Sequence, residues 1–167
     1  MYHATKKAVL LLLLPALLYS ACEIATASGI KKDFDTGLTT TYNGIEPEKV
    51  FIVMNDEVIG HTDIPLGEKF TIINDKLKGL KEKDGKFSIG CSLLVTDQGG
   101  NKVMDEADLF AGNDLFNANE VTYLKCGVST GKPMQYDESY LVTVKFWDKY
   151  GKGHIENKVT VKMIDIP

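Results

Sequence analysis

The sequence predicts an all-β protein, an antiparallel β-sandwich of six to eight strands. From about residue 50 onward, short apolar runs with a period of two alternate with turns rich in Gly, Asn, Asp and Pro. No long window shows the 3.6-residue period of an amphipathic helix. A length of 167 residues, with 44% hydrophobic and 25% charged residues, is typical of one globular domain.

The first half of this domain contains three predicted strands. Residues 50–54 are apolar at successive positions, which is typical of a strand buried on both faces. Residues 70–72 follow a Pro65-Leu66-Gly67 turn. Residues 87–95 place apolar side chains at every second position and end at a polar, glycine-rich turn over residues 97–101.

The second half begins with residues 105–120, which lack this alternation and are expected to hold one or two short helical turns. Leu124, Cys126 and Val128 then share one face of a predicted strand. Two further strands, around residues 140–146 and 159–163, complete the domain.

The last third of the chain has a recognisable strand–turn–strand pattern. Residues 140–148 precede a Tyr150-Gly151-Lys152-Gly153 turn, and residues 157–163 follow it. This pattern resembles the final hairpin of an immunoglobulin-like domain, such as the polycystic-kidney-disease modules of bacterial surface proteins. The resemblance implies an immunoglobulin-like sandwich, to which we assign residues 38–167. It also implies a tyrosine corner, in which the Tyr140 hydroxyl bonds to upstream backbone.

The N-terminus carries an export signal in residues 1–21. Lys6 and Lys7 precede an apolar stretch, residues 8–18, which is too short to span a bilayer. The following Leu18-Tyr19-Ser20-Ala21-Cys22 resembles a bacterial lipobox, which implies cleavage before Cys22 and acylation of its thiol. An ordinary signal peptide with an incidental cysteine is the alternative. Residues 22–37 are small and polar, and we expect a flexible tether there.

Three further segments point to the same class of protein. Residues 53–55, 108–110 and 132–134 read VMN, DLF and KPM. Together they resemble a family of small bacterial lipoproteins. The resemblance implies an immunoglobulin-like domain held to the cell envelope by lipid, with the outer membrane as the expected location and its face left open. It brings no catalytic residues.

The cysteine count agrees with lipidation, because three cysteines are an odd number for an exported protein. With Cys22 acylated, Cys91 and Cys126 remain as a pair. In an oxidising envelope they are candidates for a disulfide that closes a loop of about 35 residues. The alternative is two buried free thiols that act as small hydrophobic groups.

Three aromatic residues are candidates for contact with a partner. Trp147, the only tryptophan, alternates to the face opposite Phe146 and is expected to face solvent. Exposed tryptophan is frequent at protein interfaces and carbohydrate platforms, although packing under a loop is the alternative. Phe110 and Phe116 either close the open end of the sandwich or contact a partner.

Charged loops provide weaker candidates. Asp108, Asp114 and Glu120 carry the hard oxygen ligands that calcium prefers, but calcium-loop spacing is absent, and we expect no metal and no cofactor apart from the lipid. A basic stretch with interleaved acids is expected to be a solvated loop, with attraction to an anionic glycan or acidic headgroups as the alternative. Its lysines are Lys76, Lys78, Lys81, Lys83 and Lys86.

Composition and motifs exclude several functions. All 19 basic residues are lysines, and arginine, the residue suited to phosphates and guanine edges, is absent, which argues against nucleic-acid binding. No nucleophile–base pair, apolar carboxylate pair or phosphate loop indicates an enzyme. We expect a non-catalytic protein-binding or assembly module, an accessory part of an envelope or secretion complex. The alternative is a lipoprotein that binds carbohydrate or small ligands for nutrient uptake.

Overall fold

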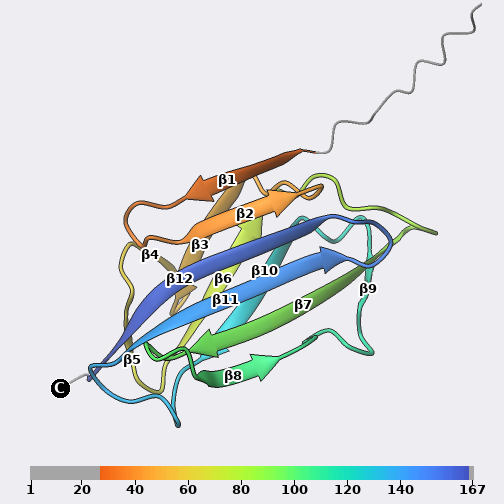
Figure 1. Cartoon of the computed structure of the whole chain (residues 1–167). Coiled ribbons are helices and arrows are strands. Elements are labelled where there is room, and N and C mark those ends of the chain that lie inside the picture. Colours follow the sequence, from red (N-terminus) through yellow and green to blue (C-terminus); the bar gives the residue numbers. More distant parts are fainter. Residues whose placement is uncertain (1–26, 166–167) are drawn as a thin grey trace, which may run out of the picture.

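The computed structural model describes residues 27–165, and within them it forms twelve strands in two facing sheets with no helix (Figure 1). This confirms the predicted antiparallel β-sandwich, although six to eight strands were expected. The large sheet has the order β1 (Ser28–Lys32), β2 (Thr39–Asn43), β12 (His154–Ile164), β11 (Ser139–Asp148), β7 (Lys86–Thr96), β8 (Lys102–Glu106), with β5 (Asp63–Pro65) beside β12 and β9 (Leu115–Asn117) beside β7. The small sheet has the order β10 (Tyr123–Ser129), β6 (Lys69–Asp75), β3 (Lys49–Met54), β4 (Glu57–Ile59).

The strand order is that of an immunoglobulin-like sandwich. In that fold one sheet contains strands A, B, E and D, and the other contains G, F, C and C′. Here β3, β6 and β10 occupy positions A, B and E, while β12, β11, β7 and β8 occupy G, F, C and C′. No described strand occupies position D, because the chain between β8 and β10 forms β9, which pairs with β7. One side of β10 therefore has no neighbouring strand within residues 27–165.

The core lies between the sheets and follows the predicted alternation. On β11, Tyr140, Val142, Val144 and Phe146 are all buried. The Tyr140 hydroxyl accepts a hydrogen bond from the backbone N–H of Gln135 at 2.9 Å. This contact confirms the predicted tyrosine corner, which fixes the turn that leads into β11.

The predicted tether was wrong for residues 28–37. β1 pairs along its whole length with β2, and the turn between them is closed by a 2.7 Å hydrogen bond from the Thr36 hydroxyl to the Asp33 carboxylate. The sequence of β2 shows no apolar alternation. A polar contact attaches this strand to the core in place of a row of apolar side chains. The Thr40 hydroxyl donates to Asn157 of β12 at 2.8 Å, and both residues are fully buried.

The helical turns expected in residues 105–120 were also wrong. β8 ends at Glu106, tight turns follow, and β9 begins at Leu115. The Asp108 carboxylate accepts the N–H of Phe110 at 3.0 Å, a local bond of the kind that competes with helix formation.

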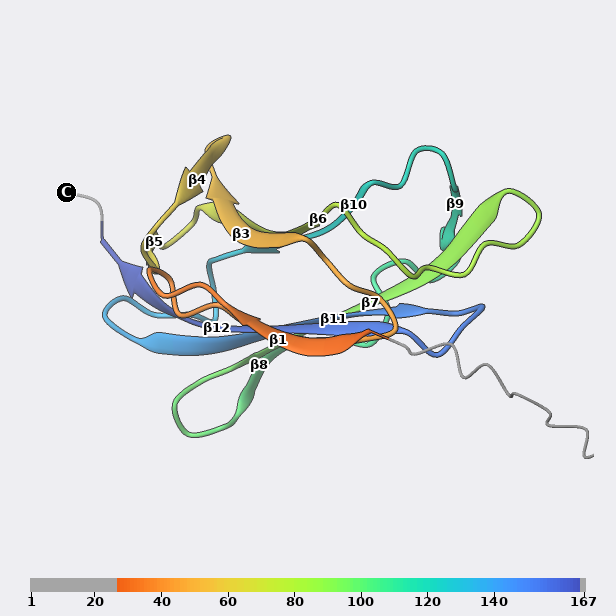
Figure 2. The same ribbon diagram turned by 90° about the horizontal axis from the view of Figure 1, so that it is seen from above.

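The two ends of the described chain lie far apart. The start of β1 is at one end of the sandwich and the end of β12 is at the other, in both views (Figures 1 and 2). The predicted signal and Cys22 lie outside the described residues. Within residues 27–165 there is no helix of the length and hydrophobicity needed to span a bilayer.

Candidate binding surfaces

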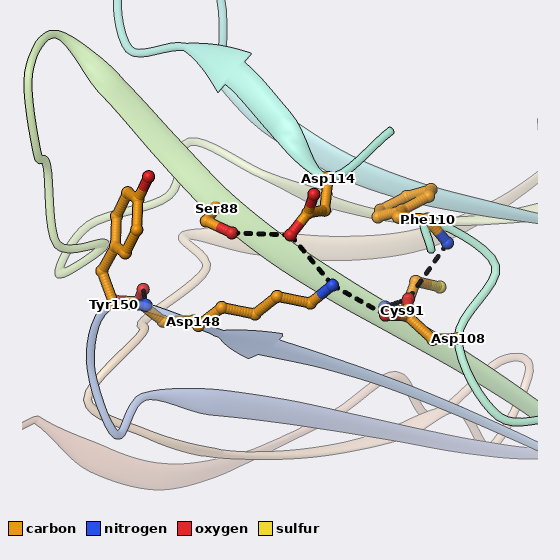
Figure 3. A network of polar contacts seen from close by, with 8 residues as sticks. Ser88, Cys91, Asp108, Phe110, Asp114, Asp148 and Tyr150 are labelled. Atoms are coloured by element: carbon orange, nitrogen blue, oxygen red, sulfur yellow. Dashed lines mark hydrogen bonds and ion pairs between the residues drawn. The ribbon is translucent and has the colours of Figure 1, made fainter. Parts of the chain in front are cut away.

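Lys149 connects the β11–β12 hairpin to the segment between β8 and β9. Its ammonium group lies 2.8 Å from a carboxylate oxygen of Asp108 and 3.0 Å from one of Asp114 (Figure 3). The Ser88 hydroxyl on β7 donates to the same oxygen of Asp114 at 2.8 Å. The Asp108 carboxylate also accepts the N–H of Cys91 at 3.1 Å. These contacts attach the segment to β7 and to the β11–β12 hairpin.

The pKa values of Lys149, Asp108 and Asp114 all shift in the direction that favours the charged form of each group. Hydrogen bonds to Asp108 and Asp114 raise the pKa of Lys149. Burial opposes ionisation of Asp108, but hydrogen bonds from Lys149, Cys91 and Phe110 together lower its pKa. Hydrogen bonds from Ser88 and Lys149 lower the pKa of Asp114. All three groups are thus charged at neutral pH and compensate one another.

This cluster changes the interpretation of the calcium candidates. Asp108 and Asp114 do come together, but the Lys149 ammonium occupies the position between them. Glu120 is not part of the cluster, and its carboxylate accepts a hydrogen bond from Asn117 at 3.1 Å. Among residues 27–165, no three acidic, histidine or cysteine side chains are arranged to hold a metal ion.

Phe110 and Phe116 line an apolar cleft of about 310 Å³ beside β10. The Phe110 ring packs between Phe116, at a centroid distance of 5.5 Å, and the core residue Phe146, at 6.4 Å. The two rings therefore close the end of the core and also form a wall that faces solvent. Val121 and Leu124 provide further apolar lining, and Glu120, Tyr123 and Lys125 complete it.

The open edge of β10 borders this cleft. Thr130 donates its N–H to the carbonyl of Glu68 at 2.9 Å and continues the β10–β6 register, so every second residue from Leu124 to Thr130 directs its backbone groups toward β6. The residues between them direct their backbone groups to the open side, where no described backbone group pairs with them. They are Tyr123, Lys125, Gly127 and Ser129.

Trp147 lies half-buried on the outer face of the large sheet, opposite His154 in the β11–β12 ladder. Its ring covers Gly90 of β7 so closely that a Cβ at that position would overlap it. The sequence predicted this outward orientation. Ser92, Lys145 and His154 surround the ring in a shallow hollow of about 540 Å³.

Cys91 on β7 and Cys126 on β10 bring their thiols together from opposite sheets. Both residues are buried, and both thiols are free in the structure. The hydrogen bond with Cys126, followed by burial, raises the pKa of the Cys91 thiol. The Cys91 thiol is therefore a poor nucleophile, whereas the same hydrogen bond lowers the pKa of the buried Cys126 thiol. The disulfide between them remains a prediction for the oxidised protein.

No protein-family model matches the chain, and no curated protein matches it either. A function must therefore be inferred from the surface itself. Sequence reasoning missed the β10 edge, because the absence of a neighbouring strand is not visible in local periodicity. It also missed a hollow of about 750 Å³ between the β1–β2 and β3–β4 hairpins, which has the charged residues Lys31, Lys32, Asp33 and Asp35 in its lining.

Proposed function

We propose that this protein is a lipid-anchored, non-catalytic module of the bacterial envelope that binds an extended segment of a partner protein along the edge of β10. The partner's backbone pairs with the outward groups of β10, and one of its apolar side chains enters the cleft beside Phe110 and Phe116. Strand addition of this kind takes its affinity from backbone hydrogen bonds and its specificity from side-chain pockets. The lipid at Cys22 raises the local concentration of the module at the membrane.

The single observation that supports this proposal is the length of the open edge. Six strands have a neighbour on one side only. Of these, β1 and β8 have five residues each, β4, β5 and β9 have three each, and β10 has seven. Proteins usually keep exposed edge strands short to avoid pairing with other chains. β10 is the longest of the six and borders the apolar cleft.

Proline at position 125 tests the proposal. The N–H of Lys125 points to the open side, so Lys125→Pro removes one outward donor while the ladder to β6 remains. A photo-crosslinking residue in place of Tyr123 should form one discrete adduct in intact cells. Lys125→Pro should abolish the adduct, and the matched control Lys125→Ala should retain it. An adduct that persists in the proline variant would contradict strand addition.

A second candidate function rests on Trp147. A half-exposed indole held flat on a sheet, with Ser92, Lys145 and His154 around it, resembles the stacking platforms that bind sugars. Calorimetry against polysaccharides tests this alternative. Binding that is lost in Trp147→Ala and unchanged in Lys125→Pro would favour the carbohydrate-binding function.

A further inference from the structure

The start of the described chain is joined to two lysine-rich loops. The N–H of Gly44 donates to the carbonyl of Ala27 at 2.8 Å. Gly44 packs against Gly153 in the β11–β12 hairpin and against Gly79 in the loop before β7, with no room for a Cβ on Gly44 or Gly79. The start of β1, this hairpin and this loop lie at the same end of the sandwich (Figures 1 and 2). We refer to residues 76–86 and 149–153 as the lysine end.

The two loops of the lysine end hold each other in place. Lys81 donates its backbone N–H to the Asp148 carboxylate at 2.8 Å, and the Lys83 ammonium lies 5.8 Å from the centre of the Tyr150 ring. Lys78 exchanges two backbone hydrogen bonds of 2.9 Å with Glu46, two residues after the Gly44 that bonds to Ala27. The lysine side chains therefore project from a preformed surface.

This end is basic although the chain as a whole has a net charge of −4. Lys76 pairs with Glu48, and Lys149 is neutralised by its two aspartates. The other lysines are exposed, and no carboxylate in the described part of the chain lies within ion-pair distance of them. They are Lys78, Lys81, Lys83, Lys86 and Lys152, against which the two loops carry only Glu82 and Asp84 as exposed acids.

Chain length decides which end of the sandwich can reach a membrane. Four residues lie between Cys22 and Ala27, so the five steps from one Cα atom to the other span at most about 18 Å when fully extended. The eleven-residue strand β12 alone extends about 35 Å toward the opposite end. An acyl chain on Cys22 therefore keeps the lysine end near the bilayer, whereas the end of β12 is free to stand away from it.

We propose that the lysine end contacts acidic phospholipid headgroups of the membrane that carries the anchor. Lysines near an anionic surface are attracted to it, and a basic patch strengthens the hold of a lipid anchor. The contact orients the sandwich upright, with the β11–β12 hairpin at the membrane and the end of β12 away from it. The inference rests on the anchor at Cys22 that the proposed function includes.

Lysine labelling on vesicles tests the orientation. The full lipidated protein is reconstituted into phosphatidylcholine vesicles with or without about one-third phosphatidylglycerol, and acylation by a soluble reagent is followed at each lysine by mass spectrometry. We expect Lys81, Lys83 and Lys152 to react several-fold more slowly on the anionic vesicles. Lys132 and Lys162, toward the opposite end, should react equally on both. Equal rates at all five lysines overturn the inference.

Charge reversal provides the matched comparison. Lys83→Glu/Lys152→Glu should abolish the protection of Lys81, whereas Lys132→Glu/Lys162→Glu should leave it intact. Slow acylation of these lysines in intact cells, without slow acylation on either kind of vesicle, would mean that a protein or glycan covers the lysine end. That result would also overturn the inference. The intact mass of the protein separates the two proposals. If acyl chains are present but all five lysines are labelled at the same rate on both vesicles, only the orientation is refuted. If the chain carries no acyl groups, the anchor and the orientation are refuted together.

Discussion

The ring of Trp147 covers Gly90, its cross-strand neighbour on β7, and leaves no space for a side chain there. Gly90→Ala should therefore displace the indole and destabilise the domain by about 1–3 kcal/mol. Because Trp147 is the only tryptophan, its fluorescence reports the displacement directly. Gly60→Ala is the control, since a Cβ there meets only Asp35 at an ordinary 3.7 Å. Equal spectra for both variants would contradict this packing.

The tyrosine corner should contribute measurably to stability. Tyr140→Phe removes the hydroxyl that accepts the Gln135 N–H, and we expect a loss of about 1–2 kcal/mol in the free energy of unfolding. Tyr136→Phe is the matched control, because Tyr136 is 52% exposed. Urea denaturation of the two variants provides the measurement, and similar midpoints would show that the corner is energetically neutral.

The Lys149 cluster should make stability depend on acid pH. The pKa values of Asp108 and Asp114 are lowered in the folded protein, so their contribution is present above about 3.9, the value for an unfolded aspartate, and is lost as the pH falls below it. Lys149→Met should unfold at lower urea concentration than the wild type at pH 7. The difference should shrink below pH 4, and a difference that stays constant would argue against the ion pairs.

Cys91 and Cys126 should be joined in protein taken from an oxidising envelope. Disulfide formation removes two hydrogens, which the intact mass shows under non-reducing conditions. The loop of about 35 residues should add about 4 kcal/mol of stability over the reduced form in the chain-entropy model. Cys126→Ala provides the reduced reference. Alkylation of both thiols after rapid denaturation of the native protein would show that they remain free.

The lipid anchor is tested by Cys22→Ala. Without an acylated thiol the chain should move from the membrane fraction to the soluble fraction, because the acyl chains provide most of the membrane affinity. Cys91→Ala, which leaves Cys22 in place, should remain with the membrane. Retention of the Cys22 variant would mean that another feature holds the protein there.

Much of the sandwich was predictable because its central strands carry strong apolar alternation. The opposite orientations of Phe146 and Trp147 follow directly from a period of two, and the position of Tyr140 at the start of β11 follows from the hairpin pattern. In these strands the local pattern and the tertiary environment agree, since each inward residue meets the facing sheet.

The remaining elements depend on contacts between distant residues. β2 is held by the buried Thr40–Asn157 hydrogen bond, which joins positions far apart in the chain and leaves no apolar signal. The segment between β8 and β9 is fixed by Lys149, which lies more than thirty residues further on. The binding surface at β10 exists because no described strand lies on its outer side. The local pattern of apolar residues in a sequence does not show which strands lack a neighbour.

The hairpin formed by β1 and β2 also has a mechanical consequence. Ser28 pairs with Asn43 at the point where the described chain begins, and Lys32 pairs with Thr39 at the far end. Because the start of β1 and the end of β12 lie at opposite ends of the sandwich, tension between them runs along the strands and loads the five β1–β2 pairs together. β1 is therefore held in shear, and β2 passes the load on to β12 through its own ladder.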